Sequence, residues 1–407
     1  MSVATPGEDL LRPPDRILVL LCRLRLERAA AEELGRLLGE GPDWGGLLED
    51  AAAFGILPLF HHHLGSPGLR DLVPEAAWRR IKAGYTVESL RSMRIFSVLG
   101  SVRRGLAQAG VPFLLLKGAH LAPWLYGDAA LRPMGDLDLL VRRRDRETVV
   151  EVLRSLGFSY DPETFFNGRA DAELAEQVGH LAPFILESFC RLEIHETLLE
   201  DDVGQPEAFL DGLWERSLPL GEGGAALALE DEVLFLAAHL HRHVRLDGTA
   251  RLCWFCDLHE LLLRFASTLD WEEIAARARA TGKWKPLGEV LGWLEIHWGS
   301  PVPAKLVRRP GVGLARILET GRGLRGNPQA PIAKVRLGYR IAQVRHLRGW
   351  GSRLRYLVTL VLPGPDRMRR LHAPGSPLGW AFWYCFHPFW KAGRYLRGKA
   401  SGVRWGR

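Results

Sequence analysis

The sequence predicts an α/β (α+β) protein in which a small sheet lies between two helical regions. Two largely apolar runs, at 111–116 and 136–141, and a segment of alternating apolar and polar residues at 191–196 predict strands. A helical pattern lies between the second and third of these segments. This alternation of strands and helices is typical of a compact α/β unit.

The remaining elements follow from apolar spacing. Before the first strand, apolar residues recur at helical intervals from 14 to 106, and 120–126 predicts one or two helical turns. Asp145 is placed to cap the helix between the strands, and Gly157 to end it. Helical periodicity returns at 230–243, 253–265 and 271–281.

These patterns divide the chain into four predicted parts. They are an N-terminal helical region (1–106), an α/β core (107–220), a helical domain (221–300) and a basic, aromatic-rich extension (301–407). The glycines at 221, 223 and 224 predict a linker between the core and the helical domain.

Charge is distributed unevenly along the chain. The net charge is +7, yet residues 301–407 hold 22 Lys/Arg and 2 Asp/Glu, whereas the first 300 hold 32 and 45. A basic tail on an acidic body indicates anionic partners for the tail. The five cysteines are few and unpatterned, which predicts reduced thiols and a cytoplasmic protein. No signal peptide or membrane-spanning run is expected.

Two carboxylates are the most informative candidate functional residues. Asp136 and Asp138 are two residues apart in a predicted strand, so they point to the same face and repel each other. A divalent cation would make the pair favourable, and Mg²⁺ is commonly held by carboxylates together with substrate phosphates. Glu193 is the candidate third acid, and His195 shares its face. The alternative is a surface strand with its polar side in water.

Cationic and glycine residues precede this pair. The turn Lys117-Gly118-Ala119 comes before a helix, where backbone N–H groups can bind phosphate. Arg132 is suited to bidentate contact with a triphosphate. The alternative for Lys117 and Arg132 is an ion pair that shields the acids when no metal is bound. The chain has neither a Gly-rich Walker loop nor a kinase signature.

Several of these motifs together resemble a known family. The motifs are Lys117-Gly118, Leu125-Tyr126-Gly127, the block 132–141 and Glu193-Ile194-His195. Over residues 15–285 the chain is similar to the uncharacterised nucleotidyltransferase family of the polymerase-β-like superfamily. The resemblance implies a minimal nucleotidyltransferase core with a mixed sheet, Mg²⁺ or Mn²⁺ as cofactor, and a nucleoside triphosphate as substrate.

The resemblance also implies roles for individual residues. Asp136, Asp138 and Glu193 would be the catalytic residues and metal ligands. The nucleotide-binding set would be Lys117, Gly118, Ala119, Arg132, Gly135, His195 and His239. The reaction would move a nucleoside monophosphate from an NTP to an unknown acceptor and release pyrophosphate.

Two features leave alternatives open. The superfamily has Gly-Gly or Gly-Ser where this chain has Gly118-Ala119, so a hydroxyl contact to phosphate is missing. This favours the alternative of a catalytically reduced nucleotide-binding protein; a second alternative, a membrane-associated accessory protein, is based on the basic tail. His239 and His243 have the i, i+4 spacing of a zinc pair, but core or cleft-lining histidines are the alternative. An ordinary helix ion pair is expected between Arg251 and Asp257.

The C-terminal extension is the second informative feature. Seven aromatic residues lie between 380 and 390, and six Lys/Arg follow before the end of the chain. Aromatic side chains and clustered cations are typical of anionic membrane surfaces, so 376–407 is expected to place the protein peripherally at the inner face of a membrane. Single-stranded nucleic acid is the less favoured partner. The alternative is a tail packed on the acidic body.

Overall fold

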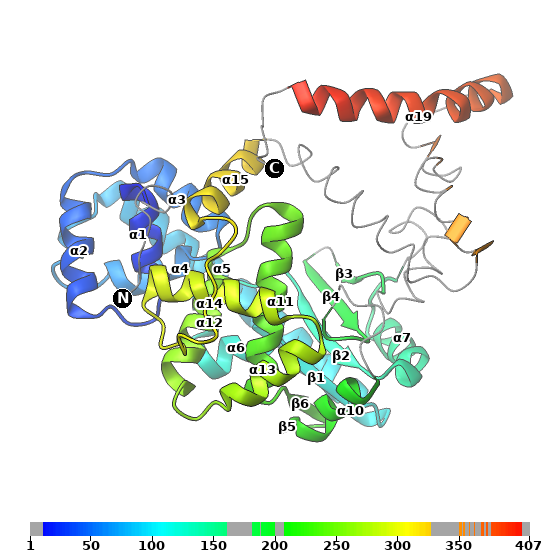
Figure 1. The fold of residues 1–407 in the computed structure, drawn as a ribbon, viewed down its shortest axis with the longest axis horizontal. Helices are drawn as coiled ribbons and strands as arrows, with labels where there is room; N and C mark the ends of the chain where they lie inside the picture. Colours follow the sequence, from blue (N-terminus) through cyan, green and yellow to red (C-terminus); the bar gives the residue numbers. More distant parts are fainter. Residues whose placement is uncertain are drawn as a thin grey trace.

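A six-stranded mixed sheet with the strand order β3-β4-β2-β1-β6-β5 lies at the centre of the protein (Figure 1). The computed structural model describes residues 11–160, 181–187, 189–199, 207–326 and 376–400, and separate residues between 350 and 372. The strands are β1 (Phe113–Leu116), β2 (Leu137–Val141), β3 (Phe184–Leu186), β4 (Cys190–His195), β5 (Leu218–Gly221) and β6 (Gly224–Ala226).

The central strand β2 determines which acidic residues meet. It runs antiparallel to β1 and parallel to β4, and this pairing sets Asp138 beside Leu116 on one side and beside Glu193 on the other. The predicted strands at 111–116, 136–141 and 191–196 correspond to β1, β2 and β4 with ends shifted by one or two residues. The mixed α/β fold class is therefore confirmed.

The predicted glycine linker is wrong. Strands β5 and β6 form an antiparallel hairpin that joins the sheet through parallel pairing of β6 with β1. Positive φ angles at Gly221, Glu222 and Gly223 form the turn, which is what these glycines permit. The predicted boundary after residue 220 therefore divides a hairpin rather than two domains.

One face of the sheet is covered by α5 (Glu75–Gln108) and α7 (Arg146–Ser155). Leu99 of α5 and Leu153 of α7 belong to one buried hydrophobic cluster with Leu137 and Leu139 of β2. Because side chains alternate along a strand, Asp138 points to the opposite face. The sequence prediction that Leu137 and Leu139 face a core is confirmed.

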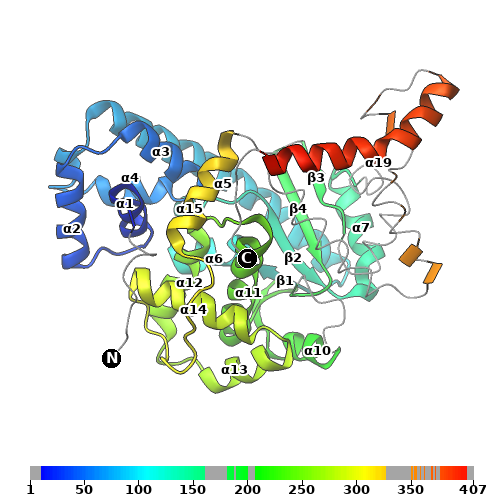
Figure 2. The same ribbon diagram turned by 45° about the horizontal axis from the view of Figure 1, so that its top comes forward.

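On the opposite side of the sheet, helices from both ends of the chain share one hydrophobic core with Leu114, Leu116 and Leu140 of the strands (Figures 1 and 2). From the N-terminal part come α1 (Pro13–Leu21), α2 (Arg28–Gly39), α3 (Trp44–Ala53) and α4 (Leu57–Leu64). From the C-terminal part come α11 (Leu229–Asp247), α12 (Leu252–Phe265), α13 (Trp271–Ala280), α14 (Trp284–Trp298) and α15 (Leu314–Gly326). The regions predicted as separate, 1–106 and 221–300, therefore pack as one helical body.

Two further helices complete the described chain. Helix α10 (Glu207–Arg216) leads into β5, and α19 (Pro377–Ala400) lies along the outside of the molecule in both views (Figures 1 and 2). No helix in the described ranges combines the length and apolar character needed to cross a bilayer. The last part of the predicted membrane-binding segment, 401–407, lies outside the described residues.

A buried ion pair joins the helical body to the sheet. Arg132, in the connection between β1 and β2, donates from Nη2 to Oδ2 of Asp257 on α12 at 2.7 Å, and from Nε to both carboxylate oxygens at 3.2 Å. The Tyr126 hydroxyl donates to the same carboxylate at 2.7 Å. Asp257 is fully buried and Arg132 is nearly so. Asp257 thus pairs with Arg132 rather than with the expected Arg251.

Replacement of one member of this pair should strongly destabilise the protein. In Arg132→Met, the Asp257 charge would remain buried without its cation, and we expect the free energy of unfolding to fall by about 3–5 kcal/mol. Urea unfolding followed by circular dichroism measures the change. The double variant Arg132→Met/Asp257→Leu, which removes both charges, should recover much of the loss. A single variant as stable as the wild type would contradict this account.

Candidate active site

Three ligand-type side chains meet where β2 and β4 lie side by side. One atom each of Asp138, Glu193 and His195 lies within 4.8 Å of the others, which is close enough for all three to bind one metal ion. The strand register explains this, because Asp138 pairs directly with Glu193, and His195 is two residues further on the same face. The prediction that Glu193 and His195 share a face with Asp138 is confirmed.

Two cationic or hydrogen-bonding groups neutralise Asp138. Lys117 Nζ donates to Asp138 Oδ1 at 2.8 Å, and His195 Nε2 lies at 2.8 Å from the same oxygen. Burial by itself would raise the pKa of Asp138, but Lys117 and His195 outweigh it and lower that pKa well below its ordinary value. Asp138 is therefore ionised in the folded protein.

The backbone of Lys117 is strained. Its φ of 50° and ψ of −130° lie in a region that residues with a side chain rarely adopt. Such strain costs roughly 1–3 kcal/mol and is concentrated at functional sites. Here the unusual backbone leads from the end of β1 into α6 (Gly118–Leu121) and holds the ammonium group against Asp138.

The other two acids are compensated only in part. Burial and the charge of Asp138 raise the pKa of Asp136. The same two causes, with Asp136 as a further one, raise the pKa of Glu193. Asp136 immediately precedes β2 and is partly exposed, and Glu193 is paired with Arg191 at 2.6 Å. The site therefore has an excess of negative charge that a bound cation would relieve.

The donor set fits a hard divalent cation. Carboxylate oxygens from Asp138 and Glu193, with Asp136 nearby, are the ligands that Mg²⁺ and Mn²⁺ prefer. His195 was expected to contact nucleotide. Instead it lies within the ligand cluster and holds one oxygen of Asp138, a position from which it can bind metal or orient the carboxylate.

Two residues that were predicted to contact phosphate, Arg132 and Gly118, contact other protein groups in the structure. The Arg132 guanidinium is buried in an ion pair with Asp257, and its contact with a triphosphate stays a prediction. Gly118 packs against this arginine, since a Cβ there would lie 2.6 Å from Arg132 Nη1. Gly118 and Ala119 are both buried, whereas Gly135 is exposed with open space around it. Close packing thus accounts for Gly118 without any phosphate.

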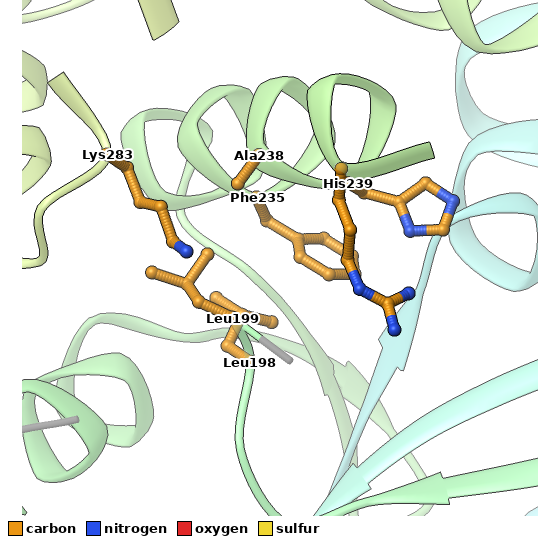
Figure 3. A pocket seen from close by; sticks show the side chains of 7 residues that line it. Leu198, Leu199, Phe235, Ala238, His239 and Lys283 are labelled. Atoms are coloured by element: carbon orange, nitrogen blue, oxygen red, sulfur yellow. The ribbon is translucent and has the colours of Figure 1, made fainter. Parts of the chain in front are cut away.

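A pocket opens beside the acid cluster on the helical side (Figure 3). Its lining combines an apolar floor with cationic side chains: Leu198, Leu199, Phe235, Ala238, His239, Arg242 and Lys283. In Figure 3, Phe235 lies at the centre facing Leu198 and Leu199, and the His239 ring is turned toward the sheet. Lys117 Nζ lies 5.9 Å from the centre of the Phe235 ring, so the pocket borders the carboxylates.

Of the histidines of α11, His239 lines this pocket. Burial, followed by the charge of Lys117, lowers the pKa of His239 well below its ordinary value, so its ring is neutral at physiological pH. His243 Nδ1 is 2.7 Å from Asp247. In the described part of the chain, the one group of ligand-type residues close enough to share a metal is Asp138, Glu193 and His195.

Some residues around the site had no signal in the sequence. Phe235 and Lys283 line the pocket, and Asp257 anchors Arg132. Phe235 and Asp257 sit in ordinary helical patterns and Lys283 immediately precedes a helix, all far along the chain from the Asp-x-Asp block. A weak signal existed for Phe235, which is four residues before His239 and hence on the same helix face.

Comparison with known proteins decides the family. A family model described as "Uncharacterised nucleotidyltransferase" matches residues 40–298, which is more than half of the chain. The protein belongs to this nucleotidyltransferase family. The match confirms the resemblance found in the sequence, and the mixed sheet with its flanking helices is consistent with a nucleotidyltransferase fold. Searches of curated proteins and of solved structures found no match.

The nucleotidyltransferase site should be destabilising when no metal is present. Because the pKa of Asp136 is raised in the folded state, protonation of its carboxyl group stabilises the folded protein. This contribution is complete at low pH and is lost as the pH rises through the raised pKa. With EDTA at neutral pH, Asp136→Asn should therefore have a larger free energy of unfolding than the wild type. The difference should shrink as the pH falls through the raised pKa, and it should be smallest below about 3.9, the ordinary aspartate pKa, where the carboxyl group is mostly protonated in both states.

Urea unfolding between neutral and mildly acidic pH measures this difference. Asp211→Asn is the matched control, because Asp211 is an exposed acid that pairs with Arg142 away from the cluster. A wild type that is as stable as Asp136→Asn at neutral pH, in the absence of metal, would show that the acids do not repel each other.

Proposed function

We propose that the protein is a metal-dependent nucleotidyltransferase that moves a nucleoside monophosphate from an NTP to an acceptor hydroxyl or phosphate and releases pyrophosphate. The observation that carries this proposal is the cluster of Asp138, Glu193 and His195, with Asp136 beside it, on the face of the sheet that borders the pocket. Membership in the nucleotidyltransferase family supports the same reaction class.

The acids would have distinct roles. Asp138, held by Lys117 and His195, is the preorganised carboxylate, and Asp136 and Glu193 supply further oxygens. Bound Mg²⁺ or Mn²⁺ would neutralise charge that develops on the phosphates during transfer. Glu193, whose pKa is raised, is suited to accept the proton of the acceptor hydroxyl if it is not occupied by metal.

The pocket is the proposed location of the nucleotide. The ring of Phe235 and the side chains of Leu198 and Leu199 offer apolar surface for a base, and Arg242 and Lys283 offer positive charge for phosphates. Lys117 lies between this pocket and Asp138. When a metal ion binds Asp138, the Lys117 ammonium group would leave that carboxylate and contact a triphosphate oxygen.

A second candidate function is nucleotide binding without turnover. One observation favours it: Lys117 Nζ already donates to Asp138 Oδ1 at 2.8 Å, so the charge of this acid is neutralised without a metal ion. The Gly118-Ala119 sequence, which lacks a hydroxyl, points the same way. Nucleotide binding that depends on Mg²⁺, without pyrophosphate release in the presence of any acceptor, would distinguish this function.

Loss of the central acid should abolish turnover. Asp138→Asn retains the size of the side chain but loses the charge needed to hold a cation, so we expect pyrophosphate release to fall by at least about 100-fold, equivalent to roughly 2.7 kcal/mol. Release is measured with each NTP and Mg²⁺, and circular dichroism checks the fold. Asp211→Asn is again the control. A fully active Asp138→Asn enzyme would exclude this mechanism.

Filling the pocket should weaken nucleotide binding without affecting the acids. Ala238→Leu adds bulk to the pocket wall at a helix position that favours leucine. We expect the KM for NTP to rise about tenfold, equivalent to about 1.4 kcal/mol, with kcat changed far less. Steady-state kinetics separate the two constants. An unchanged KM would place the nucleotide elsewhere.

A further inference from the structure

Helix α19 has one face in contact with earlier residues of the chain. Trp383 stacks on His372 with 3.7 Å between ring centres, and His387 Nδ1 lies 2.9 Å from His372 Nε2. His387 and the nearby Met368 are buried. This side of α19 is therefore covered by the preceding segment of the chain.

The other face is an exposed apolar stripe. It consists of Leu378, Phe382, Phe386 and Phe389, with exposed fractions of 84%, 54%, 48% and 71%. Steps of four, four and three residues place all of them on one side of a helix. Phe382 and Phe386 stack with 5.2 Å between ring centres, which makes the stripe continuous. Concentrated exposed apolar surface of this kind marks an interaction site.

A second exposed apolar set lies earlier in the extension. Trp350, Leu354 and Val358 are spaced by four residues and are 83%, 65% and 47% exposed. The Arg353 guanidinium lies 5.4 Å from the centre of the Trp350 ring. The extension thus repeats the combination of exposed apolar residues at helical spacing with adjacent cations.

The charge of the extension identifies the partner. From 367 to 407 the sequence has nine Lys/Arg and no Asp/Glu, and four of these cations follow the stripe within α19. Contact between the α19 helices of two copies of the chain would bring cations against cations, which is unfavourable. A convex helix stripe also lacks the groove by which proteins hold single strands. Aromatic side chains flanked by Lys/Arg suit the surface of an anionic bilayer.

We infer that α19 binds anionic membranes by lying flat in the interface, with Leu378, Phe382, Phe386 and Phe389 inserted among the lipids. This orientation directs the buried face, with Trp383 and His387, toward the rest of the protein. The inference is independent of the proposed catalytic function.

Vesicle flotation of the full-length protein tests this inference. We expect binding to vesicles of phosphatidylcholine mixed with phosphatidylglycerol, much weaker binding to phosphatidylcholine alone, and loss of binding at high salt. In the triple variant Phe382→Ser/Phe386→Ser/Phe389→Ser, binding should fall at least about tenfold, because the variant loses three rings whose burial among lipids is favourable.

Matched controls distinguish binding through this stripe from nonspecific hydrophobic adsorption. Val87, Leu90 and Met93 on α5 are comparably exposed, and their triple serine variant should bind vesicles like the wild type. Asp138→Asn should also bind normally, so failure of the catalytic proposal would leave this result unaffected. The inference would be overturned if the α19 variant bound vesicles as the wild type does. It would equally be overturned if that variant lost only self-association or only oligonucleotide binding.

Discussion

The close approach of three acids on one face of the sheet is the constraint on which the site depends. The register of β2 against β4 sets Asp138 beside Glu193, and Asp136 precedes β2 by one residue. Such a grouping of negative charge is unfavourable without compensation. Lys117, in a strained backbone conformation, and His195 outweigh this effect at Asp138 and lower its pKa, whereas the pKa values of Asp136 and Glu193 are raised. The remaining excess charge is what gives the site its affinity for a cation.

The helical body gives this charge cluster its surroundings. Helices from both ends of the chain share one hydrophobic core, and the buried Arg132–Asp257 pair fixes α12 to the connection between β1 and β2. Helix α11 then brings Phe235 and His239 to the edge of the acid cluster. The pocket is therefore formed between the sheet and the helices, so neither part can form it alone.

Local patterns predicted the sheet side of the site well. The period of two in β2 and β4 was enough to place Asp138, Glu193 and His195 on one face, because strand alternation is a short-range property. Long-range choices were not predictable in this way. Arg132 has acidic neighbours close by in the sequence, yet its partner is Asp257, 125 residues away. Spacing along the chain carries no information about which of several buried acids an arginine meets.

The same limit explains the two errors of organisation. Glycines 221, 223 and 224 indicated a break, and only pairing of β6 with β1 reveals that the break is a hairpin turn. The shared core of the N-terminal and C-terminal helices likewise depends on tertiary packing, because each helix has an apolar stripe that would suit a separate domain equally well.

The most direct test of the central claim is calorimetric titration of Mn²⁺ into the metal-free protein, comparing the wild type with Asp138→Asn. If the acids form a cation site, the wild type binds Mn²⁺ and the variant binds it far more weakly or not at all. Equal binding by the two proteins, or no binding by the wild type in the presence of nucleotide, would contradict the account.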